Sequence, residues 1–246
     1  VLSGYISGVI LNRYDEAIVF FGKAEKLFSA GKLQNSPRYF SFLRITGIFY
    51  LSRGDLKSAL EYLMKAKEKT EKNGMQESMA YLLLLDNMGT LSSRNGDNTA
   101  ALSYHMKSKE GYEKLGMKDT RIYSGVLNNI GIIYENTGRL GDALSYYLKS
   151  KDLDEKHGLR GTRDYLGSLQ NIGHVYSMLG NDKKAMDEYT ASQKGYEKCN
   201  LDNTVEYSNL MMNIALLHHS QKRYDDADKF YLKSKKIFEK LNLMNS

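Results

Sequence analysis

The sequence predicts an all-α protein, an α-solenoid of about six antiparallel helix pairs. Three observations support this fold class: residues recur every 42 positions along the chain, apolar residues within each unit recur at intervals of three and four, and Pro37 is the only proline among 246 residues. The clearest recurrence is a column of alanines, Ala17, Ala59, Ala101, Ala143, Ala185 and Ala227. Such a period with helical spacing is typical of stacked two-helix units, because each unit buries its apolar face against the next.

Other columns follow the same period and assign positions within the unit. Twelve residues before the alanine, small residues stand at Gly47, Gly89, Gly131, Gly173 and Ala215. Five residues before it, glycines suited to a left-handed turn stand at Gly54, Gly96, Gly138 and Gly180. Four residues after it, large side chains stand at Phe21, Leu63, Tyr147, Tyr189 and Tyr231, with His105 in the remaining place. We therefore expect two helices and a tight turn, with the small residue of the first helix packed against the second helix.

The expected repeats are residues 1–39, 40–81, 82–123, 124–165, 166–207 and 208–246, the first of them truncated. Each repeat is expected to hold two helices of about four turns. Gly74, Gly116 and Gly158 follow the second helix of three repeats, where a left-handed C-terminal cap is expected. Because no Ser/Gly/Pro-rich linker interrupts the repeats, we expect residues 1–246 to form a single solenoid domain. The chain begins at Val1 inside a helix and stops at Ser246 soon after one, so we expect a piece of a longer protein.

The unit resembles the tetratricopeptide repeat (TPR). Residues 127–150, LNNIGIIYENTGRLGDALSYYLKS, and 169–192, LQNIGHVYSMLGNDKKAMDEYTAS, carry the resemblance best: a small residue at the eighth position, a glycine before the second helix, an alanine at its start and an aromatic four positions later. The repeat departs from the family in its length, about 34 residues in TPR proteins, in the missing helix-ending proline, and in Leu127 at the tryptophan position. The longer unit and the phrase Asn-Ile-Gly resemble kinesin light chain and Pins-type adaptors. The resemblance implies a right-handed superhelix that binds other proteins.

Composition limits the cellular setting and the partners. Cys199 is the only cysteine, which excludes an intramolecular disulfide and suits a reducing compartment. No apolar run is long enough to span a membrane, so we expect a cytoplasmic, intracellular protein without a membrane partner, with cytoskeletal association as an open alternative.

The net charge of +6 raises the question of an acidic partner. Exposed positions six residues after the alanine carry a lysine column, Lys23, Lys65, Lys107, Lys149 and Lys233, and a glutamate column lies nearby at Glu71, Glu113, Glu155, Glu197 and Glu239. We favour a solvated convex surface of mixed charge over a basic stripe for tubulin or nucleic acid. Nucleic-acid binding would require aromatic side chains exposed beside the lysines, and the tyrosines occupy packing positions.

Residues that could perform catalysis do not form a recognisable set. The five histidines lack metal-ligand spacing, and His105 falls in the packing column, so a core histidine is the favoured interpretation. The glycines between helices lack the Gly-Lys-Ser/Thr that cradles phosphate, and no histidine is placed in sequence to act as a base for Cys199. We expect neither an enzyme nor a bound cofactor or metal.

One column indicates a binding site. Fourteen residues before the alanine, successive first helices carry Asn87, Asn129, Asn171 and Asn213. In a two-helix solenoid the first helices line the concave surface, so these amides are expected to form a ladder along a groove. An amide offers a donor and an acceptor, which matches the backbone of an extended peptide. In the families that this chain resembles, such a ladder holds a bound peptide; the alternative is that the asparagines bond to neighbouring helices and rigidify the stack.

Neighbours of the ladder are expected to set specificity. They are Arg44, Asp86, Asn128 and Gln170 one residue before it, and Thr90, Ile132, His174 and Leu216 three residues after it. The Arg44 and Asp86 end has mixed charge, whereas the C-terminal end is apolar with polar edges and suits a short motif with one or two hydrophobic anchors. The favoured function is an adaptor that binds a peptide or helix of a partner protein. A fixed structural subunit of a large assembly and the regulatory region of a longer enzyme or signalling protein remain alternatives.

Overall fold

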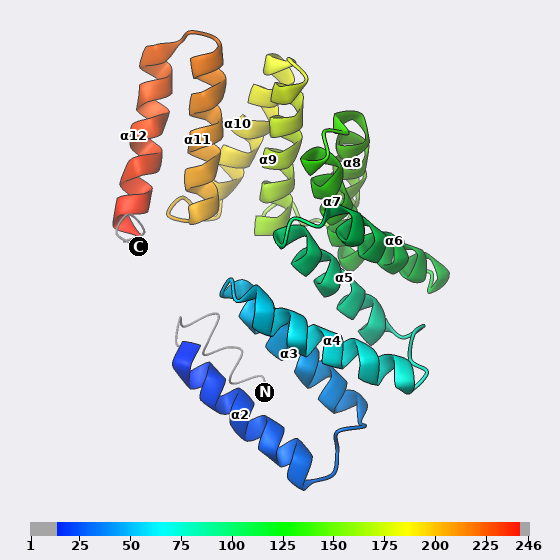
Figure 1. Ribbon diagram of the computed structural model, residues 1–246. Helices are drawn as coiled ribbons and strands as arrows, with labels where there is room; N and C mark the ends of the chain where they lie inside the picture. Colours follow the sequence, from blue (N-terminus) through cyan, green and yellow to red (C-terminus); the bar gives the residue numbers. More distant parts are fainter. Residues whose placement is uncertain (1–13, 242–246) are drawn as a thin grey trace. The chain divides into compact units, whose positions relative to one another are not determined.

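The computed structural model describes residues 14–241, and these residues form eleven α-helices and no β-strand. The helices are α2 (Tyr14–Ala30), α3 (Pro37–Ser52), α4 (Leu56–Lys72), α5 (Met79–Arg94), α6 (Asn98–Lys114), α7 (Arg121–Asn136), α8 (Leu140–Lys156), α9 (Arg163–Met178), α10 (Asp182–Lys198), α11 (Val205–Ser220) and α12 (Tyr224–Lys240). Consecutive helices pack as antiparallel pairs (Figure 1), which confirms the predicted all-α solenoid of helix pairs. The first helix expected for repeat 1 falls within residues 1–13, outside the described residues.

The first helix of each described pair begins at a hydroxyl N-cap. The cap residues are Ser36, Ser78, Thr120, Thr162 and Thr204, and the side chain of each accepts a hydrogen bond from the backbone N–H three residues later. This contact satisfies a donor that has no partner within the helix. Because the caps recur at the repeat period, equivalent residues of the first helices lie the same number of positions after the start of their own helix.

The turns follow the predicted glycine pattern. Gly138, between α7 and α8, has a φ of +75°, and Gly158, after α8, has a φ of +68°. Backbone of this hand favours glycine, since it has no Cβ to clash. Lys222, which occupies the place of Gly138 in the last repeat, adopts the same hand with a φ of +61°.

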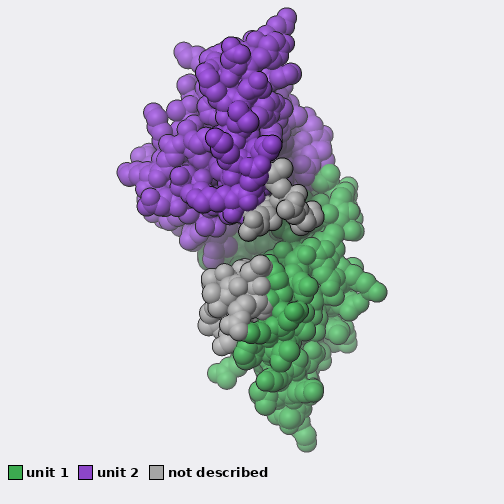
Figure 2. All heavy atoms as spheres, turned by 90° about the vertical axis from the view of Figure 1, so that its left-hand side faces the viewer, with its two compact units in different colours: residues 1–117 green, residues 118–246 purple. Residues whose placement is uncertain are grey.

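The chain comprises two compact units, residues 1–117 and residues 118–246, which Figure 2 shows in different colours. The prediction of one continuous solenoid over residues 1–246 therefore stays a prediction.

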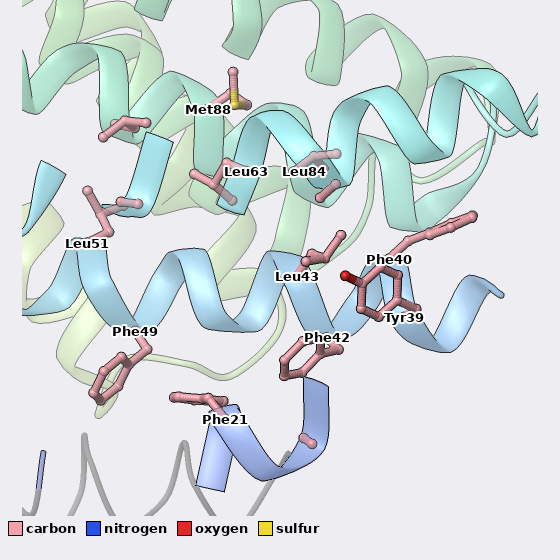
Figure 3. Packing of buried hydrophobic residues seen from close by; sticks show 14 of the residues in the cluster. Phe21, Tyr39, Phe40, Phe42, Leu43, Phe49, Leu51, Leu63, Leu84 and Met88 are labelled. Atoms are coloured by element: carbon pink, nitrogen blue, oxygen red, sulfur yellow. The ribbon is translucent and has the colours of Figure 1, made fainter. Parts of the chain in front are cut away.

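In the first unit, aromatic rings fill the space between α2 and α3. The ring of Phe21 on α2 lies 5.0 Å from that of Phe49 and 6.3 Å from that of Phe42. Figure 3 shows Phe42 and Phe49 pointing from α3 towards Phe21, while Leu43 lies on the other side of α3, towards α4 and α5. Helix α3 is thus buried on two sides, which explains its nearly continuous apolar sequence.

In the second unit, three pairs stack: α7 with α8, α9 with α10, and α11 with α12. The second helix of one pair packs against the first helix of the next, and the first helices α7, α9 and α11 contact one another in order. The glycine column allows each pair to close. A Cβ on Gly131 would lie 2.6 Å from the ring of Tyr147, and a Cβ on Gly173 would lie 2.6 Å from the ring of Tyr189.

Hydrogen bonds between tyrosine and glutamate join one pair to the next. Tyr165 near the start of α9 donates to Glu155 of α8 at 2.7 Å, and Tyr207 of α11 donates to Glu197 of α10 at 2.5 Å. The pKa of Glu155 is lowered by the hydrogen bonds from Arg160 and Tyr165, and that of Glu197 by the hydrogen bonds from Tyr207 and Gln193. Part of the glutamate column therefore connects repeats, in addition to its exposure on a charged surface. The lysine column is exposed as predicted at Lys23, Lys65, Lys107 and Lys149.

Candidate functional site

Three asparagines of the predicted ladder lie on adjacent helices of the second unit. Asn129, Asn171 and Asn213 stand on α7, α9 and α11, and each is half-buried. Each follows the N-cap threonine of its helix by nine positions. Since the helices start in register, the three amides lie at equivalent heights along the stack.

These asparagines line two adjoining cavities. A cavity of about 540 Å³ is lined by residues of α7 to α11, among them Asn129 and Asn171. A second, of about 390 Å³, is lined by Gln170, Asn171, His174, Asn209, Met212 and Asn213. Because both share Gln170, Asn171 and Asn209, they form one depression, which we call the α7–α11 groove. The groove brings together the predicted residues Asn128, Asn129, Gln170, Asn171, His174 and Asn213.

The amides differ in their internal partners. The side chains of Asn129 and Asn213 form no hydrogen bond with any described residue. Asn171 donates its side-chain N–H to Oδ1 of Asn128 at 3.3 Å, and Ser168 donates to the same oxygen at 3.2 Å. Thus one member of the ladder links α9 to α7, and two present both donor and acceptor to the groove.

His174 contributes a charge at the side of the groove. Its Nδ1 lies 2.6 Å from Oε1 of Glu135, and the other oxygen of this carboxylate, Oε2, accepts a hydrogen bond from the hydroxyl of Tyr147 at 2.7 Å. The hydrogen bond to Glu135 raises the pKa of His174, and the opposing effect of burial is smaller. The pair joins α9 to α7 and favours a positive charge on His174.

The remaining predicted residues of the second unit fall into two classes. Gln170 is 8% exposed, and its amide donates to the hydroxyl of Tyr196 at 3.1 Å. Ile132 is partly buried and packs against the core beside Tyr147. Leu216, by contrast, is 53% exposed on α11, one turn after the exposed Met212. Leu216 and Met212 therefore offer an apolar surface next to the groove.

The other four predicted residues, Arg44, Asp86, Asn87 and Thr90, lie in the first unit. Arg44 donates to Oδ1 of Asn87 at 3.2 Å, which links α3 to α5. Asp86 accepts from the hydroxyl of Tyr112 at 3.2 Å, and its other oxygen lies 3.5 Å from Nδ1 of His105. The Thr90 hydroxyl donates to the backbone oxygen of Asp86 at 3.0 Å. His105 is 1% exposed and contacts Gly89, which confirms the predicted core histidine.

The floor of the larger cavity is polar, and its residues are not among those predicted from the sequence. Ser124, Ser150 and Asp154 line it, and all three are buried. A signal was present, because Asp154 replaces the tyrosine found one repeat earlier and later, at Tyr112 and Tyr196. Among the described residues, no three His, Cys, Asp or Glu side chains are close enough to hold a metal ion. None of the helices in residues 14–241 has the length and apolar character required to cross a membrane.

Comparisons with known proteins agree with the helix-pair architecture. Two family models, both described as tetratricopeptide repeat, match residues 76–156 and residues 209–242. A search of curated protein sequences gives no match.

Solved structures share the fold at low sequence identity. BtubC (BKLC) from P. vanneervenii superposes with a TM-score of 0.72 at 13% identity, over 92% of this chain and 89% of that one. A kinesin light chain-like protein of nearly identical TPR-like repeats from Podosopora anserina gives a TM-score of 0.66 at 14% identity, over 83% and 98%. The Rap conjugation gene regulator of plasmid pLS20, solved in complex with the Phr* peptide, gives 0.71 at 16%, over 87% and 57%. Residues 76–156 and 209–242 therefore match tetratricopeptide repeats, and the chain shares the helix-pair fold of these solved structures.

Proposed function

We propose that this protein is a non-catalytic interaction module that binds an extended segment of a partner protein in the α7–α11 groove. The observation that carries the proposal is the state of Asn129 and Asn213, whose side-chain amides line the groove without a hydrogen-bond partner among the described residues. A polar side chain that is half-buried and unbonded is available to a ligand. Each amide supplies one acceptor and two donors.

The spacing of the helices suits a peptide backbone. Packed helices lie about 8 to 10 Å apart, and an extended chain rises about 3.3 Å per residue. An asparagine on each first helix would therefore meet the backbone of an extended peptide about once every three residues. Contacts of this kind hold a peptide whatever its side chains, so selectivity has to come from the surroundings of the ladder.

Two features next to the ladder support selectivity. Met212 and Leu216 present apolar surface on α11, which suits a hydrophobic anchor of the ligand. The 540 Å³ cavity between α7, α9 and the helices behind them is polar. A protein of the same fold, the Rap conjugation gene regulator, was solved with a bound peptide, which supports a peptide as the ligand class.

Asn171 supports a second role for the ladder that is compatible with the first. Its hydrogen bond to Asn128 joins neighbouring first helices and holds the groove open in one geometry. A rigid groove binds a peptide more tightly, since less ordering is required when the ligand arrives.

The proposal is tested by selecting ligands for the whole chain from a library of displayed random peptides. The variants Asn129→Ala and Asn213→Ala are compared with Asn136→Ala, which removes an exposed amide at the end of α7 outside both cavities. We expect each groove variant to weaken binding of the selected peptides by about fivefold to twentyfold, equivalent to about 1 to 2 kcal/mol, with unchanged melting temperatures.

A set of peptides that binds all variants equally well would contradict the groove assignment. If Lys149→Glu on the exposed lysine column abolishes capture of a cellular partner while the asparagine changes have no effect, the structural-subunit alternative is favoured instead.

A further inference from the structure

One repeat of the second unit departs from its neighbours at a buried position. Tyr112 on α6 and Tyr196 on α10 are 0% exposed, and each hydroxyl bonds to a polar residue of the first helix in its own pair. The equivalent residue on α8 is Asp154, 42 positions from each tyrosine. An aspartate is much smaller than a tyrosine, so the space that a phenol ring fills elsewhere is open here.

The 540 Å³ cavity occupies this place. Asp154, Ser124 and Ser150 belong to its lining, together with Asn128, and the ladder residues Asn129 and Asn171 line the same cavity. The cavity therefore opens onto the surface where a peptide backbone is proposed to lie. A side chain or chain end of that peptide could enter it beside the ladder.

The charge of Asp154 has little compensation inside the protein. The residue is 3% exposed and accepts one hydrogen bond, from the hydroxyl of Ser124. No basic side chain of the described residues forms an ion pair with it, and the nearby Arg121 is bonded to Asp164 at 2.7 Å. Burial raises the pKa of Asp154, and the lowering effects of the Ser124 hydrogen bond and of the nearby Arg121 and His157 do not cancel it.

The chemistry of the lining favours an organic cation. Two arginines face three carboxylates around the cavity, a net charge of −1, with Asp154 buried on the floor and Asp164, Arg163 and Glu206 exposed at the edge. A metal ion is a poor candidate for this cation, because no three His, Cys, Asp or Glu side chains of the described residues are close enough to hold one. A buried carboxylate without a cationic partner is costly to maintain and is often found at binding sites.

We propose that the cavity receives a positively charged group of the bound peptide, a lysine or arginine side chain or the terminal amine, and that Asp154 is its counter-ion. This inference rests on the proposed groove. It assigns a ligand chemistry to one position of the peptide, next to the residues held by Asn129 and Asn171. The hydroxyl oxygens of Ser124 and Ser150 accept the remaining N–H groups of the cation.

The test uses two libraries of displayed random peptides, one with free and one with acetylated amino termini, against the whole chain. Asp154→Asn keeps the size of the side chain and removes its charge, whereas Asp154→Tyr restores the residue found at the equivalent positions of α6 and α10. Asp152→Asn, an exposed carboxylate on the same helix, is the matched control. Thermal melts establish that each variant is folded.

We expect the wild type and Asp152→Asn to select peptides with lysine or arginine at one position of the aligned set, or to require the free terminus. Both Asp154 variants are expected to bind these peptides at least about tenfold more weakly and to select peptides without that preference. If only the free-terminus library yields binders, the terminal amine is the cation; if both do, the side chain is.

Two results overturn the inference in distinguishable ways. Binders without a basic preference, or a preference that Asp154→Asn retains, overturn the cation assignment and leave the groove in place. A wild-type chain that selects no peptides from either library overturns the proposed function and this inference together.

Discussion

The ring of Tyr147 fills the space in which Gly131 lacks a side chain. A Cβ on Gly131 would lie 2.6 Å from Cδ1 and Cε1 of the ring. The ring cannot move aside easily, because it is fully buried and its hydroxyl donates to Glu135 at 2.7 Å. The closure of α7 against α8 and the position of Glu135 next to His174 thus depend on the same contact.

Gly131→Ala is therefore expected to destabilise the protein by about 1 to 3 kcal/mol through overpacking. The control is Gly125→Ala on the same helix, where an added Cβ meets no atom within 4 Å. We expect that change to be neutral or to stabilise by up to about 1 kcal/mol, since alanine favours the helix over glycine. Urea denaturation measures both. An equal effect of the two substitutions would contradict the packing described here.

The hydrogen bond between Tyr165 and Glu155 predicts a measurable link between repeats. Tyr165→Phe removes the hydroxyl that donates to Glu155 at 2.7 Å and leaves the ring in place. We expect a loss of about 1 kcal/mol in the free energy of unfolding. The control is Tyr224→Phe, whose hydroxyl forms no hydrogen bond with the described residues and whose side chain is 55% exposed. Equal stability of Tyr165→Phe and wild type would show that the bond contributes nothing.

The pair of His174 and Glu135 predicts that stability depends on pH above about 6.5. The folded protein raises the pKa of His174 above its ordinary value of 6.5, chiefly through the hydrogen bond to Glu135. The stabilisation by the protonated ring is therefore complete below pH 6.5 and is lost as the pH rises through the raised pKa. The stability difference between wild type and His174→Gln, measured at a series of pH values, should shrink in that direction. A difference that grows with pH would contradict the assignment.

Asp154 predicts a second pH dependence at lower pH. Burial raises the pKa of this carboxyl above its ordinary value of 3.8, so it holds its proton to a higher pH in the folded state than in the unfolded chain. As the pH rises from 3.8 through the raised pKa, the wild type should lose stability relative to Asp154→Asn, because the unfolded chain releases its proton first. Ser124→Ala removes the hydrogen bond that lowers this pKa, so the loss should extend to higher pH in that variant. A stability difference independent of pH would contradict a buried, titrating Asp154.

The helix pairs could be predicted from the sequence because their signals are local and repeated. The alanine column of Ala143 and the small-residue column of Gly131 keep the same spacing from repeat to repeat. The glycine turns need a left-handed backbone conformation that few other residues adopt. The hydroxyl caps and the tyrosines that bond to glutamate also recur at the period of 42 residues.

The candidate site could be predicted only in part. The register of Asn129, Asn171 and Asn213 follows from the repeat, but their hydrogen bonds do not. Asn171 donates to Asn128 across the helix interface, whereas Asn213 has no hydrogen-bond partner among the described residues, and such differences depend on the neighbouring helix rather than on the column. Gln170 lines the groove, and its amide donates a hydrogen bond to the hydroxyl of Tyr196, which the column does not predict.

The role of Asp154 required the packed structure. In the sequence it is one acidic residue in the charged second helix of a repeat. Its importance appears only when the burial of Tyr112 and Tyr196 shows that this position points into the core, and when the cavity shows that nothing replaces the missing ring. Its mark in the sequence is an acidic residue that stands, at the repeat period, between Tyr112 and Tyr196.

The proposed contact of Asn129 and Asn213 with the backbone of a bound peptide can be measured. A double-mutant cycle tests it directly: a selected peptide is N-methylated at one backbone amide at a time, and each form is titrated calorimetrically against wild type and Asn213→Ala. We predict one methylation site at which the two changes are coupled by about 0.5 to 1.5 kcal/mol, and a different coupled site for Asn129→Ala. Additive effects at every methylation site would contradict the claim.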